Sequence, residues 1–205
     1  MILRMFGLGL FIGIFFGVPA GPIGALTIQR TLERGFTAGF ITGLGSSASE
    51  LIYSIIGVFG ISAMADIFAR FTGVLQLVGA VFIAGIGIMI LRKKRLPQKG
   101  EVSGGLLTCF LTSFITAMMN PTTLLTLLLV SASLGIEGPL DLADGAALCF
   151  GILLGSICWW AALAGITAHF RERVSEKLYL LLNKILGSMM LLFSLLMLIR
   201  AVRSW

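Results

Sequence analysis

Long apolar stretches alternate with short polar or basic segments along the whole chain of 205 residues. An α-helix needs about 20 apolar residues to cross the hydrocarbon core of a bilayer, and each of the apolar stretches reaches that length. The pattern therefore predicts an all-α, polytopic membrane protein with six transmembrane helices, over residues 5–30, 38–61, 72–91, 105–131, 145–168 and 181–200.

The composition supports a membrane protein and excludes several other classes. Hydrophobic residues make up 58% of the chain and charged residues only 12%, with a mean hydropathy of +1.05. A soluble domain of this length could not hide so much apolar surface from water. The three cysteines have no metal-ligand spacing, the single histidine has no partner, and no catalytic triad or phosphate-binding loop is present. The sequence thus predicts neither an enzyme nor a bound cofactor or metal.

The charges predict how the helices are oriented. Most of the 15 Lys and Arg residues fall in the first, third and fifth loops, namely Arg30, Arg34, Arg92, Lys93, Lys94, Arg95, Lys99, Arg171, Arg173, Lys177 and Lys184. The positive-inside rule places these loops in the cytoplasm, and both termini outside, for a multi-pass protein of the bacterial inner membrane. The net charge of +6 then reflects loops that face anionic lipid, and no nucleic-acid partner is expected.

The N-terminus allows a second interpretation. Arg4, the apolar run that follows it and the Val-Pro-Ala sequence that ends at Ala20 resemble a cleavable signal peptide. The apolar run continues to Ile28 without the polar start of a mature protein, which favours a retained first helix.

Two interruptions divide the chain into matching halves. A basic cytoplasmic linker at 92–104 separates residues 1–91 from residues 105–205, and each half contains three predicted helices. An odd number of helices per half means that the two halves insert with opposite orientation. The first helix of each half is interrupted in a matching place, by Pro19, Gly21 and Pro22 in the first half and by Asn120 and Pro121 in the second. Paired interruptions of this kind predict two inverted three-helix repeats, as in secondary transporters.

The interruptions also predict a binding site. A proline within a helix lacks an N–H group and frees a carbonyl, and such groups persist in a membrane only where they face protein or a water-filled cavity. Half-helix ends near the bilayer centre can hold the carboxylate and the ammonium group of a small molecule. The alternative is that each proline only kinks its helix for packing, but the pairing of Pro-x-Gly-Pro with Asn-Pro favours the site.

Glu50 is the one charged residue that falls deep within a predicted transmembrane helix. Gly43, Glu50 and Gly57 are seven residues apart and therefore share one helix face, with Ser46 and Ser47 on the same side. Small residues on a membrane helix indicate packing against another helix, so we expect Glu50 to face the interior. There it could transfer a proton or pair with a cationic substrate; the alternative is a permanently protonated, structural glutamic acid.

Threonines line one face of the fourth predicted helix up to its interruption. Thr108, Thr112, Thr116 and Asn120 follow one another at steps of four. The threonines could equally bond the preceding carbonyls of their own helix. The predicted pathway for substrate and proton comprises Glu50, Asn120, Pro19, Gly21, Pro22, Pro121, Ser46 and Thr116.

These motifs resemble the lysine exporter (LysE/RhtB) family of bacterial amino-acid exporters. "PAGPIGALTIQRTLERGFTAGFITGLG", followed by Glu50, resembles the first half of that family, and "NPTTLLTLLLV" and "GSICWWAAL" resemble the second. The resemblance implies an exporter of small amino acids or related metabolites, driven by proton antiport, in a lipid bilayer. It also implies roles for Pro19, Gly21, Pro22, Glu50, Asn120 and Pro121 at the matching positions. One departure is that many members have Gly-Asp where this chain has Ser49-Glu50.

Two other functions stay open from the sequence. The protein could be a non-transporting membrane scaffold or a subunit of a larger complex, in which case Glu50 would be structural. It could also export a metal ion, although the lack of paired Cys or His residues in the predicted helices disfavours soft metals. The sequence identifies neither the substrate nor the coupling ion, and it leaves a homodimer possible.

Overall fold

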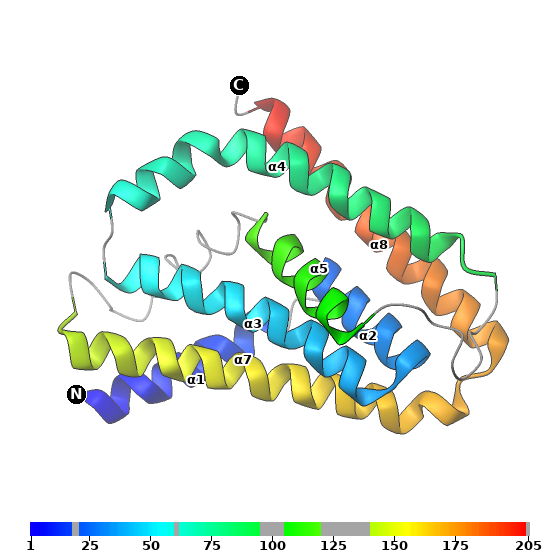
Figure 1. The fold of residues 1–205 in the computed structure, drawn as a ribbon, viewed down its shortest axis with the longest axis horizontal. Coiled ribbons are helices and arrows are strands. Elements are labelled where there is room, and N and C mark those ends of the chain that lie inside the picture. Colours follow the sequence, from blue (N-terminus) through cyan, green and yellow to red (C-terminus); the bar gives the residue numbers. More distant parts are fainter. Residues whose placement is uncertain (18–20, 60–61, 95–104, 120–139, 204–205) are drawn as a thin grey trace.

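The computed structural model describes residues 1–17, 21–59, 62–94, 105–119 and 140–203, and within these ranges every regular element is a helix (Figure 1). The elements are α1 (Ile2–Gly17), α2 (Pro22–Arg34), α3 (Phe36–Val58), α4 (Ser62–Leu91), α5 (Leu106–Met118), α7 (Leu142–Phe170), the 3-10 turn η1 (Arg171–Arg173) and α8 (Glu176–Arg203). The predicted all-α class is confirmed for the part of the chain that is described.

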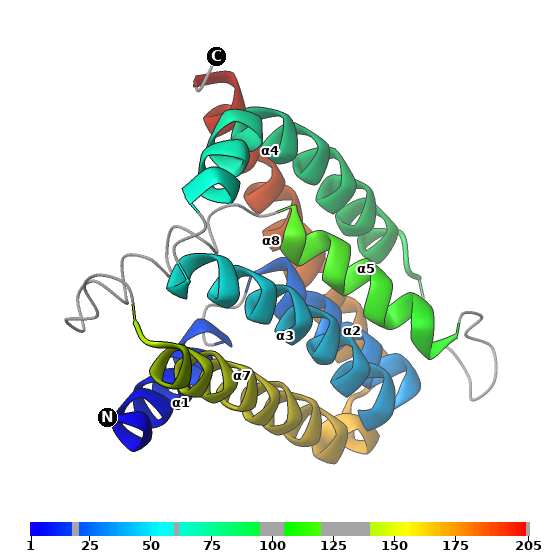
Figure 2. The same ribbon diagram turned by 60° about the vertical axis from the view of Figure 1, so that its left-hand side comes forward.

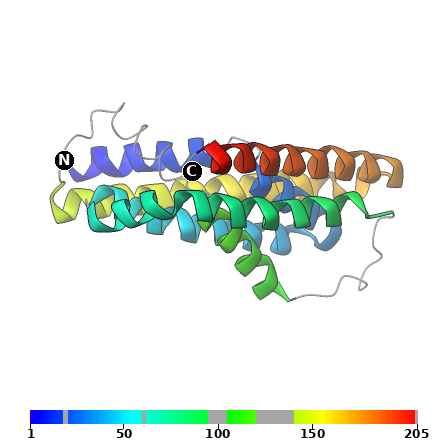
Figure 3. The same ribbon diagram turned by 90° about the horizontal axis from the view of Figure 1, so that it is seen from above.

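The helices form an elongated bundle in which partners from distant parts of the sequence lie side by side. α1 packs along α7, α4 packs along α8, and α3 lies between α5 and α7 (Figures 1 and 2). Seen from above, α1, α4, α7 and α8 follow nearly the same axis, whereas α5 leaves it at an angle (Figure 3). The short helix α2 contacts α3, α5, α7 and α8.

Several of these helices are suited to a membrane. Among the described residues, three stretches are long and apolar enough to cross one, Phe36–Val58, Leu142–Arg173 and Glu176–Ile199, and shorter apolar helices occupy Ile2–Phe15, Gln76–Leu91 and Leu106–Met118. The outer faces expose large apolar side chains such as Phe11, Val81, Met89 and Leu107. In water such a surface would favour aggregation, but in lipid it is the expected exterior. A helical membrane protein is therefore supported, while the count of six spans stays a prediction.

The first predicted helix, over 5–30, is two helices in the structure. α1 ends at Gly17 and α2 begins at Pro22, which occupies the first helical turn, where its missing N–H group is not needed. Gly21 precedes it in an extended conformation, with φ −78° and ψ −167°. The expected interruption near Pro22 is thus present, although Pro19 itself lies outside the described residues.

The second predicted interruption is described only on its N-terminal side. α5 ends at Met118, so the helix predicted over 105–131 is described as helical up to that residue. Asn120 and Pro121 lie outside the described residues.

The first predicted loop is shorter in the structure than the sequence predicts. α2 continues to Arg34, and Gly35 alone separates it from α3, with φ +88°, a conformation that favours glycine. Arg30 and Arg34 therefore lie in a helix and not in a loop. The sequence prediction ended the helix at the first arginine because it took charge as a sign of solvent, whereas both side chains find partners within the protein. α7 and α8 likewise extend a few residues beyond the predicted ranges at both ends, whereas α4 begins ten residues before the predicted start at 72 and α3 ends three residues before the predicted end at 61.

Glycines allow α1 and α7 to approach closely. A side chain at Gly9 or Gly13 would collide with the backbone of α7, and one at Gly151 or Gly155 would collide with the backbone of α1. Gly45 of α3 meets the backbone of α5 in the same way. Close backbone contact through small residues is how helices gain van der Waals energy in a membrane, where no hydrophobic force drives them together.

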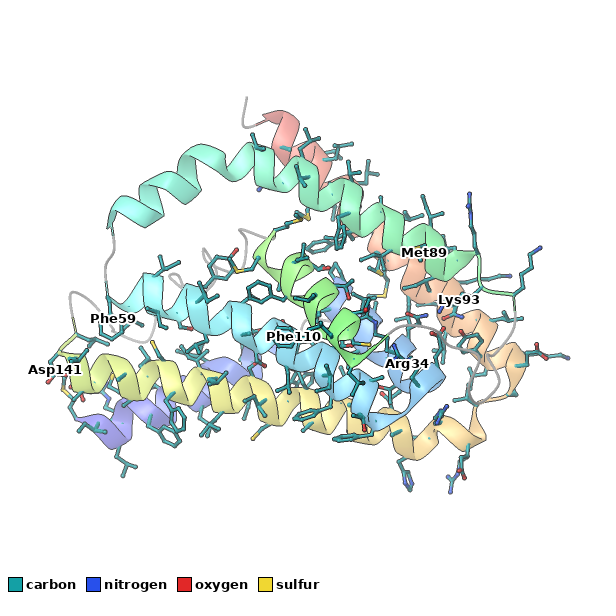
Figure 4. The ribbon with its side chains drawn as sticks, in the orientation of Figure 1. Arg34, Phe59, Met89, Lys93, Phe110 and Asp141 are labelled. Carbon is teal, nitrogen blue, oxygen red and sulfur yellow. The ribbon has the colours of Figure 1, made fainter. Side chains whose placement is uncertain are left out.

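Basic residues gather at one end of the bundle. Figure 4 shows Arg34 and Lys93 at that end, and Phe59 and Asp141 at the opposite one. Arg171 belongs to the first group, because it contacts the last turn of α2. We call this the basic end. The starts of the first, third and fifth loops thus share one end, as the sequence predicts, while the side of the membrane that this end faces stays a prediction.

Candidate functional site

Glu50 lies in α3 and points into the bundle, with only 7% of the residue exposed. Ser46, one turn earlier, donates a hydrogen bond from its Oγ to Glu50 Oε1 at 2.9 Å. The other carboxylate oxygen, Oε2, is buried and has no hydrogen-bond partner among the described residues. A buried acceptor without a donor is costly, so this oxygen is suited to receive a proton or a ligand.

The face of α3 that contains Glu50 packs against α7. Ser47 Oγ and Ser156 Oγ of α7 are hydrogen-bonded at 2.7 Å. A side chain at Gly43 would collide with Trp160, so the aromatic ring lies directly against the backbone of α3. The row of small residues on α3 therefore packs against a helix, which agrees with the expectation from their spacing.

The same helix reaches the end of α5 through Tyr53. Tyr53 is fully buried three residues after Glu50, and its Oη donates to the main-chain oxygen of Met118 at 2.6 Å. Carbonyls in the last turn of a helix have no partner within the helix, so Tyr53 satisfies one of them. Met118 comes two residues before Asn120 in the sequence. Sequence reasoning did not select Tyr53, although a tyrosine three residues from a buried acid was a usable signal.

The described hydrogen bonds do not connect the other residues of the predicted pathway to Glu50. Thr116 is buried on α5, and its Oγ donates to the carbonyl of Thr112 at 2.6 Å, which is the alternative that the sequence left open. Gly21 and Pro22 begin α2, and among the described hydrogen bonds none joins them to Glu50. Pro19, Asn120 and Pro121 are not described. The structure therefore brings Ser46 and Glu50 together and leaves the rest of the predicted pathway as a prediction.

A second buried acid lies at the basic end. Glu33, in the last turn of α2, is only 5% exposed. Its carboxylate accepts a hydrogen bond from Gln29 Nε2 at 2.6 Å and another from the Oη of Tyr179 in α8, and it forms an ion pair with Lys93. Sequence reasoning missed Glu33 because it placed the residue in a solvated loop. The spacing of four between Gln29 and Glu33 was the available signal for a helix.

Two arginines fasten α2 to its neighbours. Arg30 donates to Thr112 Oγ1 at 2.6 Å, to the carbonyl of Cys109 at 2.9 Å and to Thr42 Oγ1 at 3.1 Å. Arg171 donates to the carbonyls of Leu32 and Glu33 at 2.8 and 2.9 Å. A cation at the C-terminal end of a helix satisfies free carbonyls and interacts favourably with the helix dipole. These hydrogen bonds therefore fix the C-terminal part of α2 against its neighbours at the basic end.

The two acids differ in their surroundings and hence in what they can do. Near Glu50 the described donors are hydroxyls, those of Ser46 and Ser156, and no ion pair with it is found among the described residues. Glu33 already has a cation and two further donors. Among the described residues, no three His, Cys, Asp or Glu side chains come together as a metal site.

Comparison with known proteins identifies the family. Residues 14–201 match the family described as LysE type translocator. The chain is 27% identical over 188 residues to the "Putative amino acid efflux protein YcgF" of Bacillus subtilis (strain 168), covering 89% of each chain. It is 26% identical to the "Uncharacterized membrane protein YahN" of Escherichia coli (strain K12), covering 91% of this chain and 85% of the relative.

A third relative has a name of a different kind. The chain is 22% identical to the "Chemotactic transduction protein ChpE" of Pseudomonas aeruginosa, covering 85% of this chain and 87% of the relative. No solved structure matches the chain. The family match covers most of the sequence and agrees with the resemblance found in its motifs. The chain therefore belongs to the LysE type translocator family.

Proposed function

We propose that this translocator exports small amino acids or related metabolites across the bacterial inner membrane in exchange for protons. The family match and the relative from Bacillus subtilis named for amino acid efflux support export. The observation on which the proposal rests is the buried, half-satisfied carboxyl of Glu50, whose Oε2 has no hydrogen-bond partner among the described residues.

Glu50 could alternate between two partners. An ionised carboxylate without a cation is costly in a membrane protein, so the acid favours either a bound proton or a bound ammonium group. A proton taken from outside would neutralise Glu50 in one state. In the other state the ammonium group of the substrate would replace that proton. One carboxyl that binds each in turn couples outward movement of the substrate to inward movement of a proton.

The rest of the substrate would be held by helix ends. The first N–H groups of α2, after Gly21, have no acceptor within their helix and are suited to a carboxylate. The carbonyls near the end of α5, where Tyr53 already bonds Met118, are suited to an ammonium group. Asn120 and Pro121 would extend this second half of the site.

An inverted repeat would supply the alternating access that export requires. The first helix of each half packs on the middle helix of the other, α1 on α7 and α5 on α3. The two middle helices, α3 and α7, contact each other, and so do the two last helices, α4 and α8. A twofold relation between residues 1–91 and 105–205 predicts this pairing, so the packing supports six spans in two inverted repeats joined by a basic linker at 92–104.

Topology can be tested independently of transport. Reporters fused after Gly100 and after Trp205 should lie on opposite sides of the membrane, with the basic linker in the cytoplasm. If both reporters lie in one compartment, the inverted-repeat proposal is wrong.

Export is tested with the purified protein in liposomes. A panel of radiolabelled amino acids is offered while a pH gradient is imposed, and uptake into these liposomes is measured. At least one amino acid should accumulate only when the gradient is present. Accumulation of none, by protein shown to be folded, would favour the scaffold; accumulation of a metal ion instead would favour the other alternative.

A further inference from the structure

A second polar site, separate from Glu50, lies between α2 and α8 at the basic end. It contains the Glu33 carboxylate, which accepts hydrogen bonds from Gln29 and Tyr179. The Nζ of Lys93 forms an ion pair with the same oxygen, Oε1, that accepts both hydrogen bonds. Lys93 lies two residues beyond Leu91, the last residue of α4, and is outside any helix. Its ammonium group can therefore leave Glu33 without the loss of a helical hydrogen bond.

Asn183 is an unexplained polar residue beside this site. It lies four residues after Tyr179 on α8, so the two side chains share a helix face. Only 1% of Asn183 is exposed, and neither Oδ1 nor Nδ2 has a partner with hydrogen-bond geometry among the described residues, although the amide lies close enough to the Tyr179 hydroxyl to interact with it. Leu186, three residues further on, packs in the same apolar cluster as Leu26 of α2. Asn183 thus lies between the polar site and the apolar core on the face of α8 directed to α2.

An unpartnered amide in this position does not help the protein to fold. A leucine of similar size would avoid the cost of burying two unbonded polar atoms and would extend the apolar cluster around Leu186. The amide oxygen is, however, a suitable acceptor for a ligand that reaches past Tyr179. This is a reason to look for a ligand that needs acceptors in addition to a carboxylate.

We propose that Glu33, Gln29, Tyr179 and Asn183 form a binding site for a primary ammonium group, at the Glu33 oxygen that the ammonium group of Lys93 contacts in this structure. Three N–H donors on the ligand need three acceptors. The Glu33 carboxylate, the Tyr179 oxygen and Asn183 Oδ1 can provide them. The inference rests on the proposed function, because the ammonium group common to amino acids would meet this site first on its way from the basic end.

Binding at this site should be weak. Lys93 is a tethered competitor, and Arg171 adds a second positive charge at the carbonyl of Glu33. Weak binding suits a position that a substrate passes through. If the ion pair were only structural, removal of Lys93 would leave an unpaired acid without creating a binding site, and Asn183 would have no role.

The test uses methylammonium as the probe and thermal unfolding of the full-length protein in detergent as the measurement. If Lys93 fills the site about nine-tenths of the time, Lys93→Ala should respond at about tenfold lower methylammonium concentration than the native protein. Lys94→Ala, which removes the exposed neighbouring cation, should respond as the native protein does. Tetramethylammonium, which has no N–H donor, should have no effect on any variant.

Asn183→Leu separates binding from folding. This variant should unfold at the same temperature as the native protein or higher, yet its response to methylammonium should be lost. The double variant Lys93→Ala with Glu33→Gln should also lose the response. If Lys93→Ala does not fold, Lys93→Gln provides the same comparison, because glutamine donates a hydrogen bond to Glu33 without a positive charge.

Two results would overturn the inference. One is an equal response of Lys93→Ala with and without Glu33→Gln, and the other is a native response of Asn183→Leu. Neither result depends on transport. Failure of the ammonium site is therefore distinguishable from failure of the proposed export, which only the liposome measurement tests.

Discussion

Tyr53 of α3 donates a hydrogen bond to the main-chain oxygen of Met118, at 2.6 Å, and so joins the helix that contains Glu50 to the last residue of α5. The bond links one predicted half of the protein to the other, beside the position where the sequence predicts the second interruption. If a ligand binds between Glu50 and the end of α5, as we propose, this hydrogen bond lies beside it.

Tyr53→Phe should therefore affect transport more than folding. The loss of one buried hydrogen bond should lower the free energy of unfolding by about 1–2 kcal/mol. Gradient-driven transport should fall further than that loss explains, because the carbonyl of Met118 loses its fixed orientation. Ser54→Ala is the matched control, since the described hydrogen bond of Ser54 goes to the Glu50 carbonyl of its own helix. Native transport by Tyr53→Phe would exclude Tyr53 from the pathway.

Glu50→Gln should fold normally and lose proton coupling. Glutamine has the same size and can keep the bond from Ser46, but it cannot release a proton. Gradient-driven transport should stop, whereas exchange of substrate for substrate should continue if that step needs no proton. Glu50→Asp should retain part of the activity, because it keeps the acid but shortens its reach.

The measurement for Glu50 is uptake into liposomes with and without an imposed pH gradient. Undiminished gradient-driven uptake by Glu50→Gln would contradict the coupling role. Glu50 would then be a structural hydrogen-bond donor, which is the alternative that the sequence left open.

Gly155→Ala should destabilise the protein while Gly165→Ala should not. Both glycines lie on α7, but a methyl group at Gly155 would collide with the backbone of Leu10 in α1, whereas one at Gly165 has open space. We expect Gly155→Ala to cost about 1–3 kcal/mol, the usual range for overpacking. Alanine at Gly165 should be neutral or slightly stabilising in a helix. Thermal unfolding in detergent measures both, and equal effects would contradict the close packing of α1 on α7.

Arg171→Gln should loosen α2 at the basic end. The variant loses charged hydrogen bonds to two carbonyls of α2, which should cost about 1.5–3 kcal/mol. Arg173→Gln is the control, because Arg173 is exposed and its described contact is with the ring of Phe170. Protease digestion near Gly35 provides a local measurement: cleavage should increase in Arg171→Gln only.

Hydropathy and helical spacing predicted the features that depend on local sequence. The helical class, the interruption before Pro22 and the inward direction of Glu50 all follow from short patterns, because proline, glycine and small residues act on the helix that contains them. These features needed no knowledge of distant partners.

Features that depend on distant partners could not be predicted in the same way. Glu33 seemed a loop residue because its partners, Lys93 and Tyr179, lie 60 and 146 positions away along the chain. The end of α2 was misplaced for the same reason, since the partners of Arg30 include residues of α5. From the sequence alone, a charged residue near a membrane boundary is predicted to be solvated unless the groups that neutralise it are known.

Because Gly35 alone connects α2 to α3, α2 can tilt as a rigid rod about that end. Its 13 residues span about 20 Å at about 1.5 Å per residue. With one end fixed at Gly35 and by Arg171, a tilt of about 10° would move the other end at Pro22 by about 3.5 Å, by the geometry of a rigid rod of that length. A small tilt of α2 at the basic end, which leaves the bundle intact, would thus produce a larger displacement at the interruption before Pro22. This is where we propose that the substrate binds and dissociates.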